Sequence, residues 1–366
     1  MKKHLLIGPL PPPYNGQAVA FSYLKELKST QTNFIFYNTQ KFRWEILNYL
    51  GSIFGLTLQL VFSHFEKVYF IGARSKWGFL RQLPLFFIAN IKRVKLINHL
   101  HGADFKSFYQ QSGFLKPLVK LAYNSVHTSI VLLPGMKKEF EDFPKMHITV
   151  IPNAVGHAFD PVQPTFPKSK KVLYFSNLLA SKGIFEYLEA AEQLLLTQRD
   201  ITINIAGDFV SDHLMSARQV KELFIHKFTQ LKKQFGDQIN YLGVVTGIQK
   251  TALLEQNAIL VLPTYYPTEA LPIAILEAMT SGNAIVATKH NYLEEFLSTK
   301  NGMLIPPKSA PAIVDAVKKL FESPEKLIEK QRYNAKIAQK EFNLTTHLAR
   351  IKACLEQTHE DAFKEN

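Results

Sequence analysis

The chain has few of the features that mark secreted or membrane-spanning proteins. Cys354 is its single cysteine, so no internal disulfide can form and a reducing compartment is expected. The opening segment MKKHLLIGPLPPP carries too short an apolar run before its prolines for a signal peptide. Residues 46–62 come nearest to a membrane span, but Asn48 and Gln59 among them favour a buried or interfacial helix. We therefore expect a cytoplasmic protein.

Motifs of common cofactor and metal sites are also absent. No Gly-x-Gly-x-x-Gly follows the first expected strand, where GPLPPPYNG stands instead. This argues against a nicotinamide-dependent oxidoreductase. The sequence contains no Asp-x-Asp triplet and no Cys/His cluster, so we expect neither a metal ion nor another cofactor.

Length and charge indicate two domains with different partners. A chain of 366 residues exceeds what one hydrophobic core commonly organises. Residues 1–165 hold 19 Lys and Arg against 8 Asp and Glu, a net charge of +11. Residues 166–366 hold 24 against 22, a net of +2, and the two halves add up to the total of +13. A basic first half and a nearly neutral second half predict different binding partners.

Strand-like and helix-like segments alternate along the whole chain. In the second half, amphipathic segments such as residues 183–196 separate the apolar runs KVLYFSNL, ITINIAGD, INYLGVV, AILVLPTYY and NAIVATKH. The first half repeats the pattern with KHLLIGPL, NFIFYN, KVYFIG, VKLINHLHG, SIVLLP and ITVIPNAV. Continuous apolar strands between helices indicate parallel sheets covered on both faces. The predicted fold class is α/β with two doubly wound, Rossmann-like domains.

A proline-rich stretch marks the domain boundary. The segment HAFDPVQPTFPKSKK has three prolines and no periodicity, so we expect a linker there. The predicted domains are residues 1–163 and residues 164–341, and FNLTTHLARIKACLEQ predicts a final helix. Open α/β sheets bind ligands beyond the carboxyl ends of their strands.

Two glutamates near the end of an apolar strand are candidates for ligand binding. In PTEALPIAILEAM, Glu269 and Glu277 are separated by seven uncharged residues. Pro272 is well suited to open a helix, which would place Glu269 in a loop and Glu277 inside the helix. A helix start attracts phosphate, and carboxylates accept hydrogen bonds from vicinal hydroxyls. Alternatively, both glutamates are solvated at the surface, and their spacing alone does not decide between the two interpretations.

A family resemblance supports the first interpretation. PTEALPIAILEAMTSGNAIVAT closely resembles the donor-binding signature of the retaining glycosyltransferases of family 4. Further resembling segments follow the family's order: GPLPPPYNGQA, HLHGADF, IPNAV, SNLLASKGIFEYLEAA, INIAGDF and YLGVV. The resemblance implies the GT-B architecture, with two Rossmann-like domains facing a central cleft. It also implies that a helix of about residues 342–366 crosses back to the first domain.

The resemblance assigns roles to individual residues. Glu269 is expected to contact the donor sugar and His101 to lie beside it, as the candidate catalytic residues. Lys182 would neutralise the diphosphate and Glu277 would hold the ribose. The other candidate donor-binding positions are Gly16, Asn177, Gly243, Val244, Ala270, Leu271, Pro272 and Ile273. Without the resemblance, His101 is equally well interpreted as a core histidine that alternates with His99 along a strand end.

Asn177 departs from the family pattern. Many members carry an arginine here, and an amide cannot replace a guanidinium as a charge. Diphosphate binding would then depend more on Lys182 and the helix start. The predicted function is retaining, metal-independent transfer of a sugar from a nucleotide-sugar to a glycan or lipid-linked glycan, in bacterial surface polysaccharide biosynthesis. In the mechanism that the resemblance implies, attack occurs on the same face and the leaving phosphate accepts the proton. The alternative is a non-catalytic nucleotide-sugar or glycan-binding relative.

The basic first half suggests a membrane partner. RSKWGFLRQLPLFFIANIKRVK, residues 74–95, interleaves cations with Trp77, Phe79, Phe86 and Phe87. Such a helix can dock on anionic lipid, although a sheet-covering helix with a solvated basic face fits equally well. No recognised nucleic-acid motif is present, so nucleic acid is not an expected partner. The hypothesis is peripheral attachment to the inner membrane through the N-terminal domain.

Overall fold

The computed structural model describes residues 1–12, 15–40, 45–157 and 164–356, and no side chain of residues 45–49 or of Ser52. The chain forms two compact units, one of Met1–Asn153 together with the chain from Leu344 on, the other of Ala154–Asn343. The boundary between the two units, after Asn153, thus lies before the predicted linker. Residues 158–163 of that linker lie outside the described part. Residues 13–14 of the opening segment and 357–366 of the predicted final helix do so as well.

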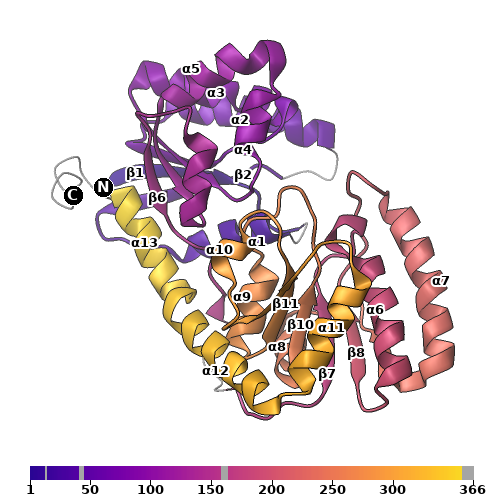
Figure 1. Ribbon diagram of the computed structural model, residues 1–366. Coiled ribbons are helices and arrows are strands. Elements are labelled where there is room, and N and C mark those ends of the chain that lie inside the picture. The colour runs from indigo at the N-terminus through magenta and orange to yellow at the C-terminus, as the bar shows by residue number, and fades with distance from the viewer. Residues whose placement is uncertain (13–14, 41–44, 158–163, 357–366) are drawn as a thin grey trace. The chain divides into compact units, whose positions relative to one another are not determined.

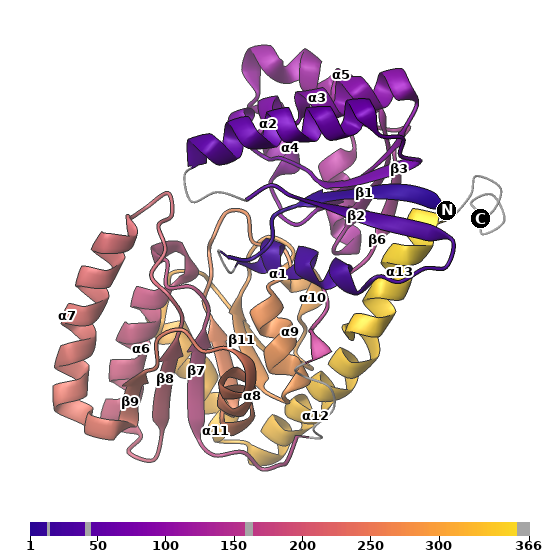
Figure 2. The same ribbon diagram turned by 180° about the vertical axis from the view of Figure 1, so that it is seen from behind.

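The first unit is built on a six-stranded parallel sheet of order β2-β1-β3-β4-β5-β6. Its strands are β1 (Lys2–Gly8), β2 (Thr32–Asn38), β3 (Lys67–Ile71), β4 (Lys95–Leu100), β5 (Val126–Val131) and β6 (His147–Val150). Its helices are α1 (Gly16–Tyr23), α2 (Glu45–Phe62), α3 (Lys76–Lys92), α4 (Phe105–Gln110), α5 (Lys116–Asn124) and α13 (Leu344–Glu356). Figures 1 and 2 show α2, α3 and α5 on one side of this sheet and α1 and α13 on the other.

The two faces of this sheet have separate cores because successive side chains of a strand point in opposite directions. Phe70 of β3 meets Phe86 of α3, with ring centroids 5.4 Å apart. Tyr69, its neighbour in the strand, shares the opposite core with Ile351 of α13. The last helix of the chain therefore completes the hydrophobic core of the first unit.

Helix α2 is buried on one side only. Leu56 and Leu60 are 4% and 2% exposed, whereas Phe54 and Phe62 are 68% and 80% exposed. This agrees with the predicted interfacial or buried helix over residues 46–62. Within the described residues, no helix combines the length and the apolar character that a membrane crossing needs.

The second unit repeats the architecture with the order β12-β11-β10-β7-β8-β9. Its strands, all paired in parallel, are β7 (Lys171–Phe175), β8 (Thr202–Ala206), β9 (Ile239–Tyr241), β10 (Ile259–Leu262), β11 (Ala284–Thr288) and β12 (Gly302–Ile305). Its helices are α6 (Ile184–Thr197), α7 (Ala217–Phe235), α8 (Gly247–Gln256), α9 (Ile273–Thr280), α10 (Leu293–Phe296), α11 (Ala310–Phe321) and α12 (Pro324–Glu341). The predicted fold class of two doubly wound sheets is confirmed, with β12 as a strand that the sequence pattern did not reveal.

Local sequence signals explain where the elements of the second unit begin. Ser216 accepts a hydrogen bond from the backbone of Gln219, whose side chain in turn accepts one from Ser216, a capping box that starts α7. Pro272 stands immediately before α9 as its cap, one position earlier than the first helical residue. This leaves Glu277 as the fifth residue of α9, well inside the helix as predicted.

The fold predicts that α13 is needed for the stability of the first unit. The change Ile351→Ala should lower the free energy of unfolding by about 2–5 kcal/mol, because it opens a cavity in a core where Ile351 is fully buried. Urea denaturation of the full chain would measure this. Thr345→Ala, at an exposed position of the same helix, is the matched control and should change little. Equal stability of both variants would contradict the packing of α13 on this sheet.

Candidate functional site

The order of strands in the second unit creates a switch point between β7 and β10. From β7 the chain adds β8 and β9 on one side, whereas β10, β11 and β12 continue on the other. The segments that follow β7 and β10 therefore diverge at the carboxyl edge of the sheet. Ligands of open α/β sheets bind at this position.

Two glycines allow the loops at this edge to approach closely. A Cβ atom on Gly207, after β8, would lie 1.8 Å from the carbonyl oxygen of Ser176, after β7. A Cβ atom on Gly183 would lie 2.4 Å from the carbonyl oxygen of Pro263, after β10. Both glycines also have positive φ angles, 149° and 75°. The loops after three neighbouring strands thus touch through their backbones.

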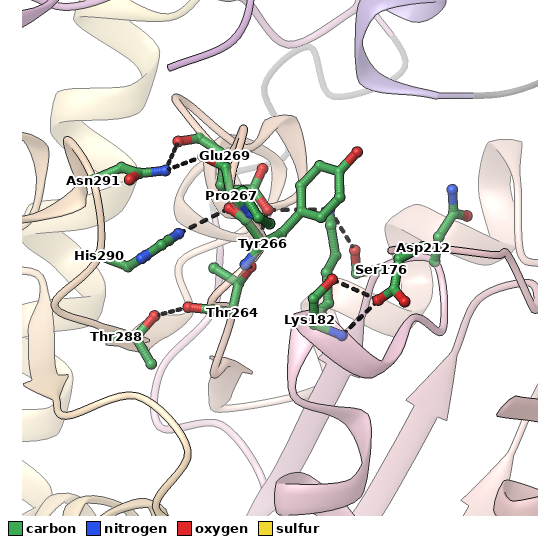
Figure 3. Close-up of polar contacts among 12 residues, drawn as sticks. Ser176, Lys182, Asp212, Thr264, Tyr266, Pro267, Glu269, Thr288, His290 and Asn291 are labelled. Atoms are coloured by element: carbon green, nitrogen blue, oxygen red, sulfur yellow. Dashed lines mark hydrogen bonds and ion pairs between the residues drawn. The ribbon is translucent and has the colours of Figure 1, made fainter. Parts of the chain in front are cut away.

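Lys182 and Glu269 meet at the switch point. The Lys182 ammonium lies 3.2 Å from Oε2 of Glu269 and donates a hydrogen bond of 3.1 Å to Oγ of Ser176 (Figure 3). The side chains of Lys182 and Glu269 are only 18% and 9% exposed. The Tyr266 ring lies beside them, with its centroid 5.9 Å from the ammonium. Two residues that were predicted for one site, from different loops, thus form a largely buried ion pair.

The loop that carries Glu269 is held by polar contacts. The Thr264 hydroxyl donates to Oε2 of Glu269 at 3.2 Å. The Asn291 amide donates to the backbone carbonyls of Pro267 and Glu269 at 3.0 and 2.9 Å (Figure 3). Asn291 has a φ angle of 47°, a left-handed conformation that asparagine tolerates better than most residues. The carboxylate and its backbone are therefore fixed from two sides.

Contacts from β11 and the segment after it fix the rest of this loop. His290 donates through Nε2 to the carbonyl of Tyr266 at 2.8 Å, and the Thr288 hydroxyl donates to the carbonyl of Thr264 (Figure 3). None of Thr264, Thr288, His290 and Asn291 was predicted from the sequence pattern. They follow or end the neighbouring strands β10 and β11, and the rule that ligands gather at carboxyl ends could have pointed to them.

Asp212, a further residue that the sequence analysis missed, anchors the turn that precedes Lys182. Ser181 donates to its Oδ2 through both the backbone amide, at 2.7 Å, and the hydroxyl, at 2.6 Å. Burial raises the pKa of this carboxyl, but these bonds and those from the amides of Met215 and Leu214 outweigh it and lower the pKa from its ordinary value. The ionised Asp212 thus holds the Lys182 turn in place.

Glu277 is buried in α9 and paired with a lysine of α8. The residue is 4% exposed, and its Oε1 accepts a hydrogen bond of 2.6 Å from the Lys250 ammonium. Burial raises the pKa of Glu277, and the Lys250 charge opposes this rise. The interpretation of Glu277 as a solvated surface residue is therefore wrong. Lys250 gave no sequence signal, because its partner is recognisable only once α8 and α9 are packed together.

The other predicted donor-binding residues of this unit surround the same edge. Ala270, Leu271, Pro272 and Ile273 form the buried entry into α9. Asn177 is half-buried directly after Ser176. Gly243, with a φ angle of 64°, accepts a hydrogen bond of 2.8 Å from the amide of Gly207, and Val244 beside it is 60% exposed.

His101 and Gly16 belong to the first unit and are described within it. Gly16 begins α1, and Asn15 caps this helix by accepting a 2.9 Å hydrogen bond from the amide of Ala18. His101 follows β4, with its ring centroid 4.0 Å from that of His99. Burial, with smaller contributions from the charges of Arg74 and His347, lowers the pKa of His101 to about 3. His101 is therefore a neutral imidazole near pH 7.

Among the described side chains, no group of three or more His, Cys, Asp or Glu is arranged to hold a metal ion. Metal independence of the predicted reaction stays a prediction.

Comparison with known proteins identifies a matching family and a curated relative. Residues 158–338 match the family described as "Glycosyl transferases group 1". The alpha-D-kanosaminyltransferase of Streptomyces kanamyceticus is 30% identical over 169 residues. This match spans 45% of the present chain and 39% of that protein, so the chain spans well under half the length of this curated relative.

Solved structures resemble nearly the whole chain in fold. A glycosyltransferase from Rickettsia africae superimposes with a TM-score of 0.72 at 15% identity, covering 100% of this chain and 99% of that one. HepE of Anabaena, solved with UDP-glucose, gives a TM-score of 0.72 at 17% identity and covers 97% and 99% of the two chains. The sucrose-phosphate synthase of Thermosynechococcus elongatus gives 0.72 at 15% identity and covers 98% and 99%. The fold is thus the GT-B fold of such enzymes.

The Lys250–Glu277 pair predicts a pH-dependent loss of stability. The change Lys250→Met should cost ~3 kcal/mol at neutral pH, because it leaves a buried carboxylate without its cation. The ordinary pKa of 4.5 is already raised in the folded protein and should rise further in the variant. The gap in unfolding free energy between wild type and variant should therefore widen as the pH rises above the folded wild-type pKa of Glu277, which lies above 4.5, and close below it. Urea denaturation across this range would measure the gap.

The double variant Lys250→Met/Glu277→Gln is the control for this prediction. It has no carboxyl group at position 277, so its stability relative to wild type should not fall with rising pH in the same way. A pH-independent cost of Lys250→Met would show that Lys250 acts through its hydrocarbon chain and not through Glu277.

His101 predicts the opposite pH dependence in the first unit. Its pKa falls from 6.5 to about 3 on folding, so the unfolded chain binds the proton more readily below pH 6.5. The folded state should lose up to about 1.4 kcal/mol per pH unit through this group as the pH falls towards 3. The variant His101→Gln should lose less stability on acidification, whereas His213→Gln, at an exposed position, should behave as wild type. Parallel pH profiles of all three proteins would contradict the buried, neutral state of His101.

Proposed function

Since the chain belongs, through residues 158–338, to the group 1 glycosyl transferases, we propose that it transfers a sugar from a nucleotide-sugar donor to an acceptor hydroxyl. The observation that carries the proposal is the buried ion pair of Lys182 and Glu269 at the switch point of the second sheet. A cation and a carboxylate side by side can serve the two halves of such a donor. The cation suits the diphosphate, and the carboxylate suits the hydroxyls of the sugar.

In this proposal, the diphosphate replaces Glu269 as the partner of Lys182. The ammonium and the first turn of α9, with its positive dipole end, would stabilise the negative charge that develops as the diphosphate leaves. Until a donor binds, each side chain compensates the other's buried charge. With Asn177 in place of the family's arginine, Lys182 and the helix start carry the larger part of this task.

Glu269 and Glu277 would orient the two sugars of the donor. Contacts from Thr264 and Asn291 hold Glu269 in one position, so that its oxygens can accept hydrogen bonds from the transferred sugar. Glu277, kept next to Lys250, would accept from the ribose hydroxyls. The solved structure of HepE carries UDP-glucose, which supports this class of donor for the present chain.

The finer features of the reaction are also part of the proposal. His101, a neutral imidazole, would contribute from the first unit by hydrogen bonding to the transferred sugar. We propose a retaining outcome, in which the acceptor attacks from the face of the leaving group and the leaving phosphate takes the acceptor's proton. No step requires a metal ion, since Lys182 and α9 provide the positive potential.

We propose that the acceptor is a glycan or lipid-linked glycan of a bacterial surface polysaccharide. The excess of positive charge in residues 1–165, a net of +11, supports an acceptor that lies at an anionic membrane surface. The protein would then work at the cytoplasmic face of the inner membrane.

The proposal predicts separate effects for the two members of the ion pair. A thermal-shift screen of UDP-, GDP- and ADP-sugars should find one donor that raises the melting temperature of the wild type. Lys182→Met should weaken the binding of that donor about tenfold to a hundredfold, since a hydrogen bond to a charged group contributes about 1.5–3 kcal/mol. Glu269→Gln should lower sugar transfer by on the order of a hundredfold.

Lys221→Met, at an exposed position of α7, is the matched control and should bind the donor as the wild type does. A wild type that binds a nucleotide-sugar but neither hydrolyses nor transfers it would favour the non-catalytic alternative. Transfer at the wild-type rate by Glu269→Gln would overturn the role of the pair.

A further inference from the structure

An apolar stripe runs along the solvent side of α2. Leu50, Phe54, Leu58 and Phe62 recur every four residues, so they lie on one face of the helix. Their exposed fractions are 58%, 68%, 40% and 80%. A stripe of this kind on a protein surface marks a site of contact with a partner.

The neighbouring helices extend the apolar surface. Figures 1 and 2 show α3 beside α2 and α5 beyond it, on the same side of the sheet. Large apolar side chains on their outer faces are exposed as well: Trp77, Phe87 and Ile91 of α3, and Phe114, Leu118 and Leu121 of α5 and the turn before it. We name the outer surface of α2, α3 and α5 the helical face.

The chain around the helical face carries almost no negative charge. Residues 45–138 contain 12 Lys and Arg and three acidic residues, Glu45, Glu66 and Asp104. Glu66 is ion-paired with Lys2 at 3.0 Å and Asp104 with Arg74 at 2.5 Å. Of these cations, five belong to α3 and α5, so the helices of the helical face have an excess of positive charge: Lys76, Arg81, Lys92, Lys116 and Lys120.

Cations lie directly among the apolar side chains. Lys92 of α3 donates to the carbonyls of Leu60 and Val61 at the end of α2, at 2.8 and 2.5 Å. On α5, the exposed Lys116 and Lys120 alternate with Leu118 and Leu121. Lys92, which also donates to the carbonyl of Ser63 at 3.1 Å, thus caps the end of α2, and the cations of α5 lie among its apolar side chains.

We propose that the helical face docks on an anionic lipid surface, with the α2 stripe inserted among the acyl chains and the cations at the headgroups. This inference rests on the proposed function only in placing the acceptor at that surface. Burial of apolar side chains in the acyl region favours binding, and so does the attraction between cations and anionic headgroups. The sequence suggests lipid docking for residues 74–95 and a buried or interfacial helix for residues 46–62, and the exposed stripe gives α2 the leading part in this proposal.

The charge of the helical face decides between lipid and other occupants. A second copy of the chain would bring the same excess of positive charge against itself, which is unfavourable. Nucleic acid would match the charge, but it has no counterpart for a row of leucine and phenylalanine side chains on a helix. An anionic lipid surface matches both the charge and the apolar side chains.

Vesicle flotation of the full chain tests the proposal. The wild type should float with vesicles that contain phosphatidylglycerol and remain unbound with pure phosphatidylcholine. The double variant Phe54→Gln/Leu58→Gln should lose at least tenfold in binding, and Lys116→Gln/Lys120→Gln should lose about thirtyfold, from ~1 kcal/mol per cation. The matched controls are Leu196→Gln/Leu223→Gln and Lys221→Gln/Lys326→Gln, exposed positions of the second unit that should leave flotation unchanged.

A second measurement separates this inference from the proposed function. Thermal shift with nucleotide-sugars should be the same in the helical-face variants and the wild type, because these residues lie outside the donor site. Flotation that all variants retain, or that is equal with both kinds of vesicle, would overturn the docking proposal and leave the donor site untouched. A wild-type dimer in sedimentation, dissociated by Phe54→Gln/Leu58→Gln and unable to bind vesicles, would show that a second copy occupies the face.

Discussion

The geometry of the second unit depends on one constraint of parallel sheets, that the carboxyl ends of all strands lie at the same edge. Because the winding reverses between β7 and β10, the segments after these strands diverge and leave Lys182 and Glu269 opposite each other. Opposite charges at a largely buried position stabilise each other, whereas either alone would be costly. Hydrogen bonds hold the two loops that carry this pair. Asp212 accepts from Ser181 in the turn before Lys182, and Asn291 donates to the backbone of the Glu269 loop.

Much of the fold could be predicted from sequence because the strands are buried on both faces. Segments such as VLYF and AILVL are apolar throughout, and helices of a different periodicity separate them. Strand β12 was not predicted, because Gly302–Ile305 is only four residues long and begins with a glycine. The division after Asn153 likewise has no local signal, because it depends on which residues pack together and not on the prolines further along.

The site was predicted unevenly. Lys182, Glu269 and Glu277 were predicted through a family resemblance, since the spacing of the two glutamates alone did not decide between ligand binding and a solvated surface. Lys250 and His290 were not found. Each acts on a segment that is distant in sequence, Lys250 on α9 and His290 on the loop after β10, so its contact exists only in the folded unit. Patterns of hydrophobicity indicate which face of a helix is buried. They do not indicate which polar side chain pairs with a buried carboxylate.

The Lys182–Glu269 contact has a consequence for the release of the nucleoside diphosphate that sugar transfer would leave in the site. A spent nucleoside diphosphate would still attract the ammonium of Lys182, but it offers Glu269 no sugar hydroxyls in exchange. The buried carboxylate would keep the Thr264 hydroxyl and lose its counter-charge. Product retention would thus carry an electrostatic penalty that the intact donor avoids, and this difference would favour turnover over inhibition by the leaving group.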